Sequence, residues 1–577
     1  MVKNIDEKSN AKAAVDKITG AKSNYQDDIK KEMDIIEKNK DYVVEIIDLN
    51  HEGQGVGHIG KLAVFVEGGV IGEKIEVKVI KIAKNYAVGK LQKIIRPSKS
   101  RVEPFCPNVR KCGGCSIQHI DYNSQLAYKT NLVKETLKRI GKIDESMVHD
   151  IIGMENPFNY RNKVQLPVGI SNGKLEIGFY AKRSHDIVDN DECKIQDPVC
   201  DEIRIILRNF IAANRIDVYD ETSHQGLIRH LMVRKGFRTG EVMVVIVING
   251  KDLPAKRRLI DELVRQVPSI KSIMLNINTQ KTNIILGNNN VKIYGEDTIT
   301  DYIGDFKFYI SPLSFFQVNS VQAEVLYNKV LEFSDLSGKE TVFDLYCGTG
   351  TIALFLAKKA LKVYGVEVVE DAVQDAWKNA EINSVKNTEF VLGDVEKMLP
   401  ELYAQGVKAD VIVVDPPRKG CETPLLDTIV DIHPNKVVYV SCNPATLARD
   451  LMYLEGKGYK TMEVQPVDMF PQTEHVETVV LLSQQRPDDK IEIDLDLDEL
   501  DITSAESEAT YEEIKSYILK KYGFKVSSLY IAQVKQKCGI IERINYNVSK
   551  KEDVGVPKCP KEKEDAIMET FKHFRMI

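Results

Sequence analysis

The residue with the clearest chemical potential is a cysteine at the end of an apolar run. Cys442 follows "KVVYV" and precedes an Asn-Pro turn in "SCNPATLARD". The run predicts a buried strand, and the turn places the thiol at its open end, within reach of a ligand. A thiolate there can add to an electrophilic carbon and leave again, which is nucleophilic catalysis. A buried structural cysteine is the alternative, because free cysteines are mostly interior residues.

Carboxylates end the neighbouring apolar runs. "TVFDLYCGTG" is typical of a strand followed by a glycine turn that lets a ligand approach the backbone. The next run ends in Glu367, which suits two ribose hydroxyls, and the third reaches Asp394, near an adenine amine. The fourth, "ADVIVVDPPRKGC", ends in Asp415 beside two prolines that stiffen the loop. A helix cap is the alternative for each carboxylate separately. The set favours an adenosylmethionine-dependent methyltransferase over a dehydrogenase.

These groups together suit methylation of a pyrimidine carbon. C5 of uracil is a poor nucleophile, and addition of a Cys442 thiolate at C6 makes C5 electron-rich enough to accept a methyl group. A base must then remove the C5 proton, and Glu477 in "TEHVETVVLL" is the carboxylate best placed to do so. The residue types therefore predict Cys442 as nucleophile and Glu477 as base.

A second group of cysteines has the spacing of ligands. "CPNVRKCGGC" places Cys106, Cys112 and Cys115 in a C-x5-C-x2-C pattern. Cys193 in "NDECKIQDP" is a fourth candidate, with Cys200 as its rival. Glycines between the thiols let backbone amides turn toward sulfur, which suits a metal ion or an iron–sulfur cluster. Spacing alone leaves zinc at least as good an interpretation as a cluster.

The elements that must position these groups follow from the apolar pattern. Asp41 to Ile95 alternates in short runs broken by glycines, which predicts a small β-barrel. After Leu336, apolar runs alternate with amphipathic helices, which predicts a parallel sheet covered by helices on both faces. Between these regions the pattern is mixed α and β.

Charge is distributed unevenly along the 577 residues, whose formal net charge is -6. Asp488 to Glu513 carries a net charge of -11, so the remainder is +5. Between Lys74 and Arg101, nine Lys or Arg accompany a single Glu. A phosphate track is the functional interpretation and a solvated face the alternative. Further basic candidates lie on a predicted strand in "GLIRHLMVRKG", namely Arg229, His230, Arg234 and Lys235.

The composition of the chain indicates its cellular compartment. No apolar run approaches the ~20 residues of a bilayer span, and the N-terminal stretch lacks the apolar core of a signal peptide. The ten cysteines are spread thinly through a long chain, which favours metal binding or catalysis over disulfides. We therefore expect a cytoplasmic protein.

Several motifs resemble a known family. "DPPRKGC", "SCNPATLARD" and "HVETVVLL" are similar to signatures of the RNA uracil-5-methyltransferase family, and "SPLSFFQVN" is similar to its entry motif. The barrel pattern resembles the TRAM domain, an oligonucleotide-binding-like barrel of RNA-modifying enzymes. The resemblance implies a catalytic set and a cofactor set: Cys442 as nucleophile, Glu477 as base, Asp415 near both the uracil and the methyl donor, and Gln317, Tyr346, Glu367 and, as an addition, Asp394 as contacts to S-adenosylmethionine. Through the family's ribosomal-RNA branch it also implies a [4Fe-4S] cluster on Cys106, Cys112, Cys115 and Cys193.

The expected fold class is α/β, with a Rossmann-like methyltransferase domain preceded by the small β-barrel and a mixed α+β central domain and followed by a helical appendage. The expected segments are a polar tail (1–38), the TRAM barrel (39–99), the central domain with the cluster (100–310), the methyltransferase domain (311–485), an acidic linker (486–513) and the appendage (514–577).

The expected function is methylation of C5 of a uridine in 23S ribosomal RNA, with no membrane and no obligate protein partner. Transfer RNA is the alternative substrate. A base N-methyltransferase normally follows its Asp-Pro-Pro turn with a stacking aromatic residue, whereas Arg418 stands there. Cytosine-5 methylation and a non-catalytic RNA-binding iron–sulfur protein are the remaining alternatives.

Overall fold

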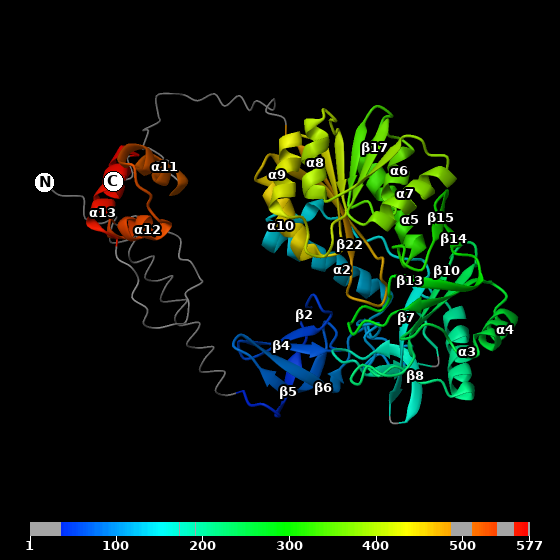
Figure 1. Ribbon diagram of the computed structural model, residues 1–577. Coiled ribbons are helices and arrows are strands. Elements are labelled where there is room, and N and C mark those ends of the chain that lie inside the picture. The colour runs from blue at the N-terminus through cyan, green and yellow to red at the C-terminus, as the bar shows by residue number, and fades with distance from the viewer. Residues whose placement is uncertain (1–35, 172, 191, 486–510, 539–558, 575–577) are drawn as a thin grey trace. The chain divides into compact units, whose positions relative to one another are not determined.

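The computed structural model describes residues 36–171, 173–190, 192–485, 511–538 and 559–574. They belong to two compact units, which divide at residues 486 and 487 (Figure 1). Most of the expected polar tail and acidic linker lies outside the described residues. Within the described ranges, no helix combines the length and apolarity needed to span a membrane.

The first sheet of the larger unit is built by the N-terminal strands in the order β1-β5-β6-β4-β3-β2. A Cβ at Gly57 would lie 2.2 Å from a methyl carbon of Val44 and 2.6 Å from the Glu45 carbonyl oxygen, so only glycine lets β3 pass this close to β1. Alternate side chains such as Val64 and Val77 fill the interior. The strands are β1 (Asp41–Glu45), β2 (Asp48–Leu49), β3 (Gly55–Ile59), β4 (Leu62–Glu67), β5 (Lys74–Ile82) and β6 (Tyr86–Arg96).

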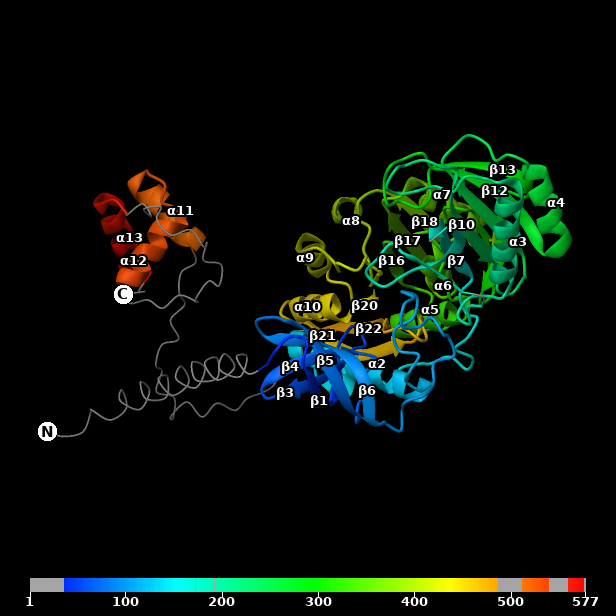
Figure 2. The ribbon, with the colours of Figure 1, turned by 90° about the horizontal axis from the view of Figure 1, so that it is seen from below.

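The central sheet has seven strands in the order β13-β12-β11-β10-β7-β8-β9. Helices α3 and α4 lie together against one face (Figures 1 and 2). Met232 and Met243, from the other face, join the core of the methyltransferase domain, so the inner strands are buried on both sides. The elements are β7 (Lys163–Ser171), β8 (Lys174–Tyr180), β9 (Ile187–Asp189), α3 (Val199–Asn214), β10 (Ile228–Lys235), β11 (Val242–Ile248), α4 (Lys256–Gln266), β12 (Ile270–Ile277) and β13 (Asn289–Gly295).

The prediction that β10 presents a basic face to RNA is wrong. Arg229, His230 and Arg234 are each only 4% exposed, and Lys235 pairs with Asp197 at 2.6 Å. The physical reason is that β10 is an interior strand packed on both faces, so its charged side chains must find partners inside the protein.

The methyltransferase sheet runs in the order β18-β17-β16-β19-β20-β22-β21. Its first five strands are parallel, and the strand order reverses between β16 and β19, where such sheets bind ligands. β22 runs antiparallel to both of its neighbours, β20 and β21. The short connection 468–476 joins β21 directly to β22, which is possible only between antiparallel neighbours. The strands are β16 (Thr341–Leu345), β17 (Lys362–Glu367), β18 (Thr388–Leu392), β19 (Val411–Val414), β20 (Lys436–Ser441), β21 (Tyr459–Val467) and β22 (Glu477–Gln484).

Helices cover both faces of this sheet, as Figure 1 shows. One layer holds α5 (Ser320–Ser334), α6 (Thr351–Ala357) and α7 (Glu370–Ile382), and the other holds α8 (Val395–Ala404), α9 (Thr423–Ile432) and α10 (Pro444–Glu455). The hairpin of β14 (Ile299–Ile303) and β15 (Phe306–Ile310) packs in the first layer's core. The expected α/β class, with its Rossmann-like domain, is confirmed.

An N-terminal helix reaches into the catalytic half of the chain. α2 (Tyr122–Thr136) continues through a π-helical turn (Leu137–Gly141) and is followed by a short 3-10 helix (Glu145–Met147). Lys129 on α2 pairs with Asp468 at 2.5 Å, and both side chains are fully buried. A buried ion pair adds little net stability but fixes geometry, because each charge needs its partner. It therefore holds the connection 468–476 to α2.

The described residues of the smaller unit form three helices with their own apolar core, which includes Ile518, Ile531 and Phe571. Its helices are α11 (Tyr511–Tyr522), α12 (Ser528–Lys537) and α13 (Lys561–His573).

Candidate active site

A cavity of about 1110 Å³ opens at the carboxyl ends of β16, β17, β19 and β20. Residues 311–318, termed here the wall segment, form another side, and Phe470, His475 and Glu477 close it from the region after β21. Such a volume exceeds that of a typical single-ligand pocket, so the cavity can hold a nucleoside-sized cofactor and a second ring together. Six predicted site residues line it: Gln317, Tyr346, Glu367, Asp415, Cys442 and Glu477.

Strand register brings the thiol and its expected base together. β20 and β22 are antiparallel, and Ser441 is directly opposite Thr478. Cys442 and Glu477 are therefore the next facing pair at the end of these two strands. Asp415 follows β19, which is parallel to β20, so its carboxyl group reaches the same edge.

These three acidic groups share a poorly solvated space, which changes their protonation. Burial raises the pKa of the Cys442 thiol to about 11, and the carboxylates of Glu477 and Asp415 add to the rise. Burial, followed by the charge of Asp415, raises the pKa of Glu477 well above its usual range. Burial alone raises the pKa of Asp415 to about 6. The Arg418 guanidinium opposes the rise for both Cys442 and Glu477. It is therefore the charge that favours a thiolate here.

The loop that carries Arg418 is fastened to the start of α10. The Arg418 carbonyl oxygen accepts hydrogen bonds from the Asn443 side-chain amide at 3.1 Å and the Thr446 hydroxyl at 3.2 Å. Asn443 also caps α10 by accepting from the Ala445 N–H. The residue after the cysteine thus ties the Asp-Pro-Pro-Arg loop to the strand that presents the thiol.

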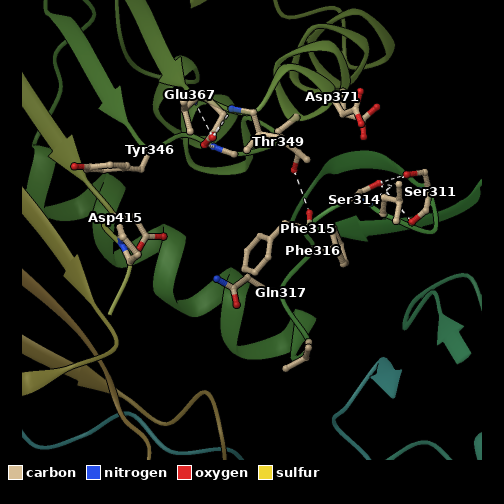
Figure 3. Close-up of a pocket in the computed structure, with 18 of the residues that line it drawn as sticks. Ser311, Ser314, Phe315, Phe316, Gln317, Tyr346, Thr349, Glu367, Asp371 and Asp415 are labelled. Atoms are coloured by element: carbon tan, nitrogen blue, oxygen red, sulfur yellow. Dashed lines mark hydrogen bonds between the residues drawn. The ribbon is translucent and has the colours of Figure 1, made fainter. Parts of the chain in front are cut away.

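The opposite side of the cavity is built around a glycine turn. Glu367 accepts N–H bonds from Gly348 at 3.0 Å and from Val368 and Val369 at 2.9 Å each, which fixes the carboxylate. Tyr346 adopts a left-handed φ of 65°, a strained conformation that places it at the cavity edge. Figure 3 shows Tyr346, Glu367 and Asp415 bordering the same space.

Asp394 lies apart from the other predicted cofactor contacts. It does not line the cavity, and its exposed carboxylate caps α8 by accepting the Glu396 N–H at 3.1 Å. The helix-cap alternative describes what the side chain does in this structure.

The sequence analysis missed several aromatic residues of the cavity. Phe315 is 62% exposed, and Figure 3 shows its ring turned toward the cavity next to Gln317. Phe470 and His475 come from the connection between β21 and β22. The position of His475 inside "HVETVVLL" and of Phe315 inside "SPLSFFQVN" was a usable signal, whereas nothing in the sequence marks Phe470.

The four predicted ligand cysteines line one small cavity, whereas Cys200 belongs to α3 and is buried in the core of the central domain. The Gly114 backbone N–H donates to the Cys112 sulfur, with 3.4 Å between nitrogen and sulfur, a contact that would stabilise a thiolate ligand. Burial raises the pKa of Cys115 to about 12 and of Cys193 to about 11. The cavity has only about 10 Å³, and no three His, Cys, Asp or Glu within the described ranges are grouped to hold a metal ion. The four thiols supply the donor set of a cluster, but they are not drawn together around one centre in the described ranges.

Comparisons with known proteins identify the family. An uncharacterized RNA methyltransferase of Clostridium tetani is 54% identical over 448 residues, 78% of this chain and 97% of that protein. A relative described in the same words from Caldanaerobacter subterraneus is 52% identical over 78% of this chain and all of its own. The family described as tRNA (Uracil-5-)-methyltransferase matches residues 200–485, and the TRAM domain matches residues 37–91. The chain belongs to the RNA uracil-5-methyltransferase family.

A solved structure shares this architecture. The tRNA (uracil-54, C5)-methyltransferase of Pyrococcus abyssi, in complex with S-adenosyl-L-homocysteine, is 31% identical, with a TM-score of 0.63 over 76% of this chain and all of that one. This methyltransferase is therefore an S-adenosylmethionine-dependent RNA-modifying enzyme, and the large cavity must admit both the methyl donor and a base.

The charge balance at Cys442 predicts a pH effect. Because burial raises the pKa of the Cys442 thiol to about 11, the thiol is mostly protonated near neutral pH, and the single-turnover methylation rate should rise with pH from about 7 to 9. Arg418→Gln should shift this rise toward alkaline pH by roughly one unit, since the guanidinium lowers the thiol's pKa. Lys419→Gln, which removes an exposed lysine paired with Glu422, is the matched control. Equal profiles for both variants would contradict the role of Arg418.

Proposed function

We propose that this methyltransferase methylates C5 of a specific uridine in 23S ribosomal RNA, with Cys442 as the covalent nucleophile and Glu477 as the base. The observation that carries the proposal is the facing pair of a thiol and a buried carboxyl group at one cavity edge, in a uracil-5-methyltransferase.

The cofactor side of the proposal uses the other cavity residues. Gln317, Tyr346, Glu367 and Asp415 hold S-adenosylmethionine, which supplies an electrophilic methyl group. Glu367 is supported by its strand-end position and by its fixed carboxylate, which keeps a free face toward the cavity. Asp394 does not line the cavity, and its contact with the adenine amine stays a prediction.

The steps follow from the acid–base arrangement. The Cys442 thiol gives its proton to solvent, and the sulfur bonds to C6 while the C5–C6 π electrons move toward the O4 carbonyl. C5, now electron-rich, takes the methyl group as the donor's sulfur–methyl bond breaks, and the donor departs as S-adenosylhomocysteine. Glu477 removes the proton from C5, the double bond re-forms and the sulfur–C6 bond breaks. The raised pKa of Glu477 makes its carboxylate a stronger base than an exposed glutamate.

Two variants test the covalent mechanism. Cys442→Ala should reduce turnover by at least 1,000-fold while RNA binding persists, because the nucleophile is lost and the cavity is not. Glu477→Gln should accumulate RNA bonded to the protein, since methyl transfer proceeds and elimination does not. Denaturing gels with labelled RNA measure both outcomes. Normal turnover by Cys442→Ala would exclude the nucleophilic role.

The choice between ribosomal RNA and transfer RNA as the substrate rests on other parts of the chain. The TRAM barrel and the four-cysteine region support ribosomal RNA as the target. Transfer RNA is the second candidate, because the structural relative from Pyrococcus abyssi acts on it and the matched family is named for it. Total RNA from cells lacking this chain, treated with the protein and labelled methyl donor and then sorted by size, separates the two. We expect label as 5-methyluridine in 23S RNA, and label confined to transfer RNA contradicts the ribosomal assignment.

We also propose a [4Fe-4S] cluster on Cys106, Cys112, Cys115 and Cys193, as a structural group with no step in the reaction. Its support is the convergence of four thiols from two segments on one cavity. Binding would have to move the thiols around a common centre.

The cluster predicts about four irons per chain after anaerobic purification, with visible absorbance that Cys115→Ser removes and Cys200→Ser leaves unchanged. Zinc in place of iron, or equal iron in both variants, would contradict the cluster.

A further inference from the structure

We propose that Arg234 and Asn162, two buried residues of the central domain, form a clamp that sets the wall segment and so positions Gln317 for the methyl donor. Both act as positioning residues, because neither lines the cavity itself. The inference rests on the proposed contact between Gln317 and S-adenosylmethionine.

The wall segment has little regular structure of its own. Residues 311–318 belong to no helix or strand, and the segment's internal bonds join Ser311 and Ser314, whose hydroxyls lie 2.7 Å apart (Figure 3). Phe315 and Gln317 nonetheless project into the cavity. Their positions must therefore be set by groups outside the segment.

Arg234 supplies one half of the clamp. Its guanidinium donates to the carbonyl oxygens of Ser314 at 2.6 Å and Pro312 at 3.3 Å. Arg234 is 4% exposed, and within the described part of the chain no carboxylate forms an ion pair with it. Burial lowers its pKa to about 10, so it remains charged at neutral pH. The charged guanidinium therefore binds backbone carbonyl groups of the wall segment and, among the described residues, no carboxylate.

Asn162, which directly precedes β7, supplies the other half. Its side-chain amide donates to the Gln317 carbonyl oxygen at 2.9 Å and to the Ser320 hydroxyl at 2.8 Å. Its backbone N–H donates to the Val318 carbonyl at 2.8 Å. Its carbonyl in turn accepts the Lys235 N–H at 2.8 Å, which links the two halves through neighbouring strands.

Fold stability does not explain this arrangement. A guanidinium buried without a carboxylate partner costs free energy, and an apolar residue of similar volume is often tolerated equally well at such a position. The clamp instead holds three carbonyl groups on the two sides of Phe315, those of Pro312, Ser314 and Gln317. A displacement of about 1 Å in such a positioning element is enough to lose up to 100-fold in activity.

β10 itself provides a matched control. Arg229 lies on the same strand, is equally buried and also bonds backbone carbonyls, those of Asn278, Gln280 and Thr282. These three residues do not line the cavity. Replacing either arginine therefore removes a similar buried charge, but only one replacement releases the wall segment.

The test compares Arg234→Met with Arg229→Met in the full chain. S-adenosylhomocysteine is titrated by calorimetry, and single-turnover rates are measured at saturating donor. We expect Arg234→Met to raise the Kd about tenfold or more, with a melting temperature close to that of Arg229→Met, whose Kd stays within about twofold of the wild type. An unchanged Kd in Arg234→Met, or equal losses in the two variants, overturns the clamp.

Asn162→Ala provides a second variant in case Arg234→Met does not fold. It should raise the Kd in the same direction, and the double variant should lose less than the product of the two single losses, because both release one segment. Independent losses overturn a shared clamp. Binding of S-adenosylhomocysteine is measured without RNA, so the outcome stays separate from whether the proposed uridine in 23S RNA is the target.

Discussion

The structure depends on the pairing of β20 with β22, which forces a thiol and a carboxyl group to share one poorly solvated edge. The register that places Ser441 opposite Thr478 leaves Cys442 facing Glu477, with Asp415 arriving from β19. Three acidic groups in such a space cannot all ionise, so protons are retained until a substrate or the Arg418 guanidinium changes the balance. That constraint suits a reaction in which sulfur must first lose a proton and a carboxylate must later gain one.

The second half of the site is held by residues far away in the sequence. The connection 468–476, which ends one residue before Glu477, is fixed by Lys129 on α2 and by the Tyr160 hydroxyl, which donates to the Pro471 carbonyl at 3.0 Å. The wall segment is held in the same way by Asn162 and Arg234. The central domain therefore acts as a frame for two irregular sides of the cavity, besides any contact it makes with RNA. Its buried charges stabilise positions rather than the fold as a whole.

Much of the catalytic half could be predicted from the sequence. Apolar runs that end in Glu367, Asp415 and Cys442 mark strand ends, and parallel strands bring their carboxyl ends to one edge, so these residues could be placed together without coordinates. The same logic could not show that Asp394 lies outside the cavity lining, because a carboxylate at a strand end can also cap a helix. Arg234 was misread, because the charge of a strand residue does not reveal that both faces of its sheet are covered. Phe470 lies in a connection whose path is set by tertiary contacts alone.

The central claim is that the Cys442 sulfur bonds to C6 of the target uracil. Substrate RNA that carries 5-fluorouridine tests it most directly, because fluorine replaces the C5 proton that Glu477 must remove, and the sulfur–carbon bond then cannot break. With S-adenosylmethionine present, mass spectrometry of the digested protein should find one methylated fluorouridine adduct on the peptide that contains Cys442. An adduct on another residue, or methylated product with no adduct at all, would contradict the account.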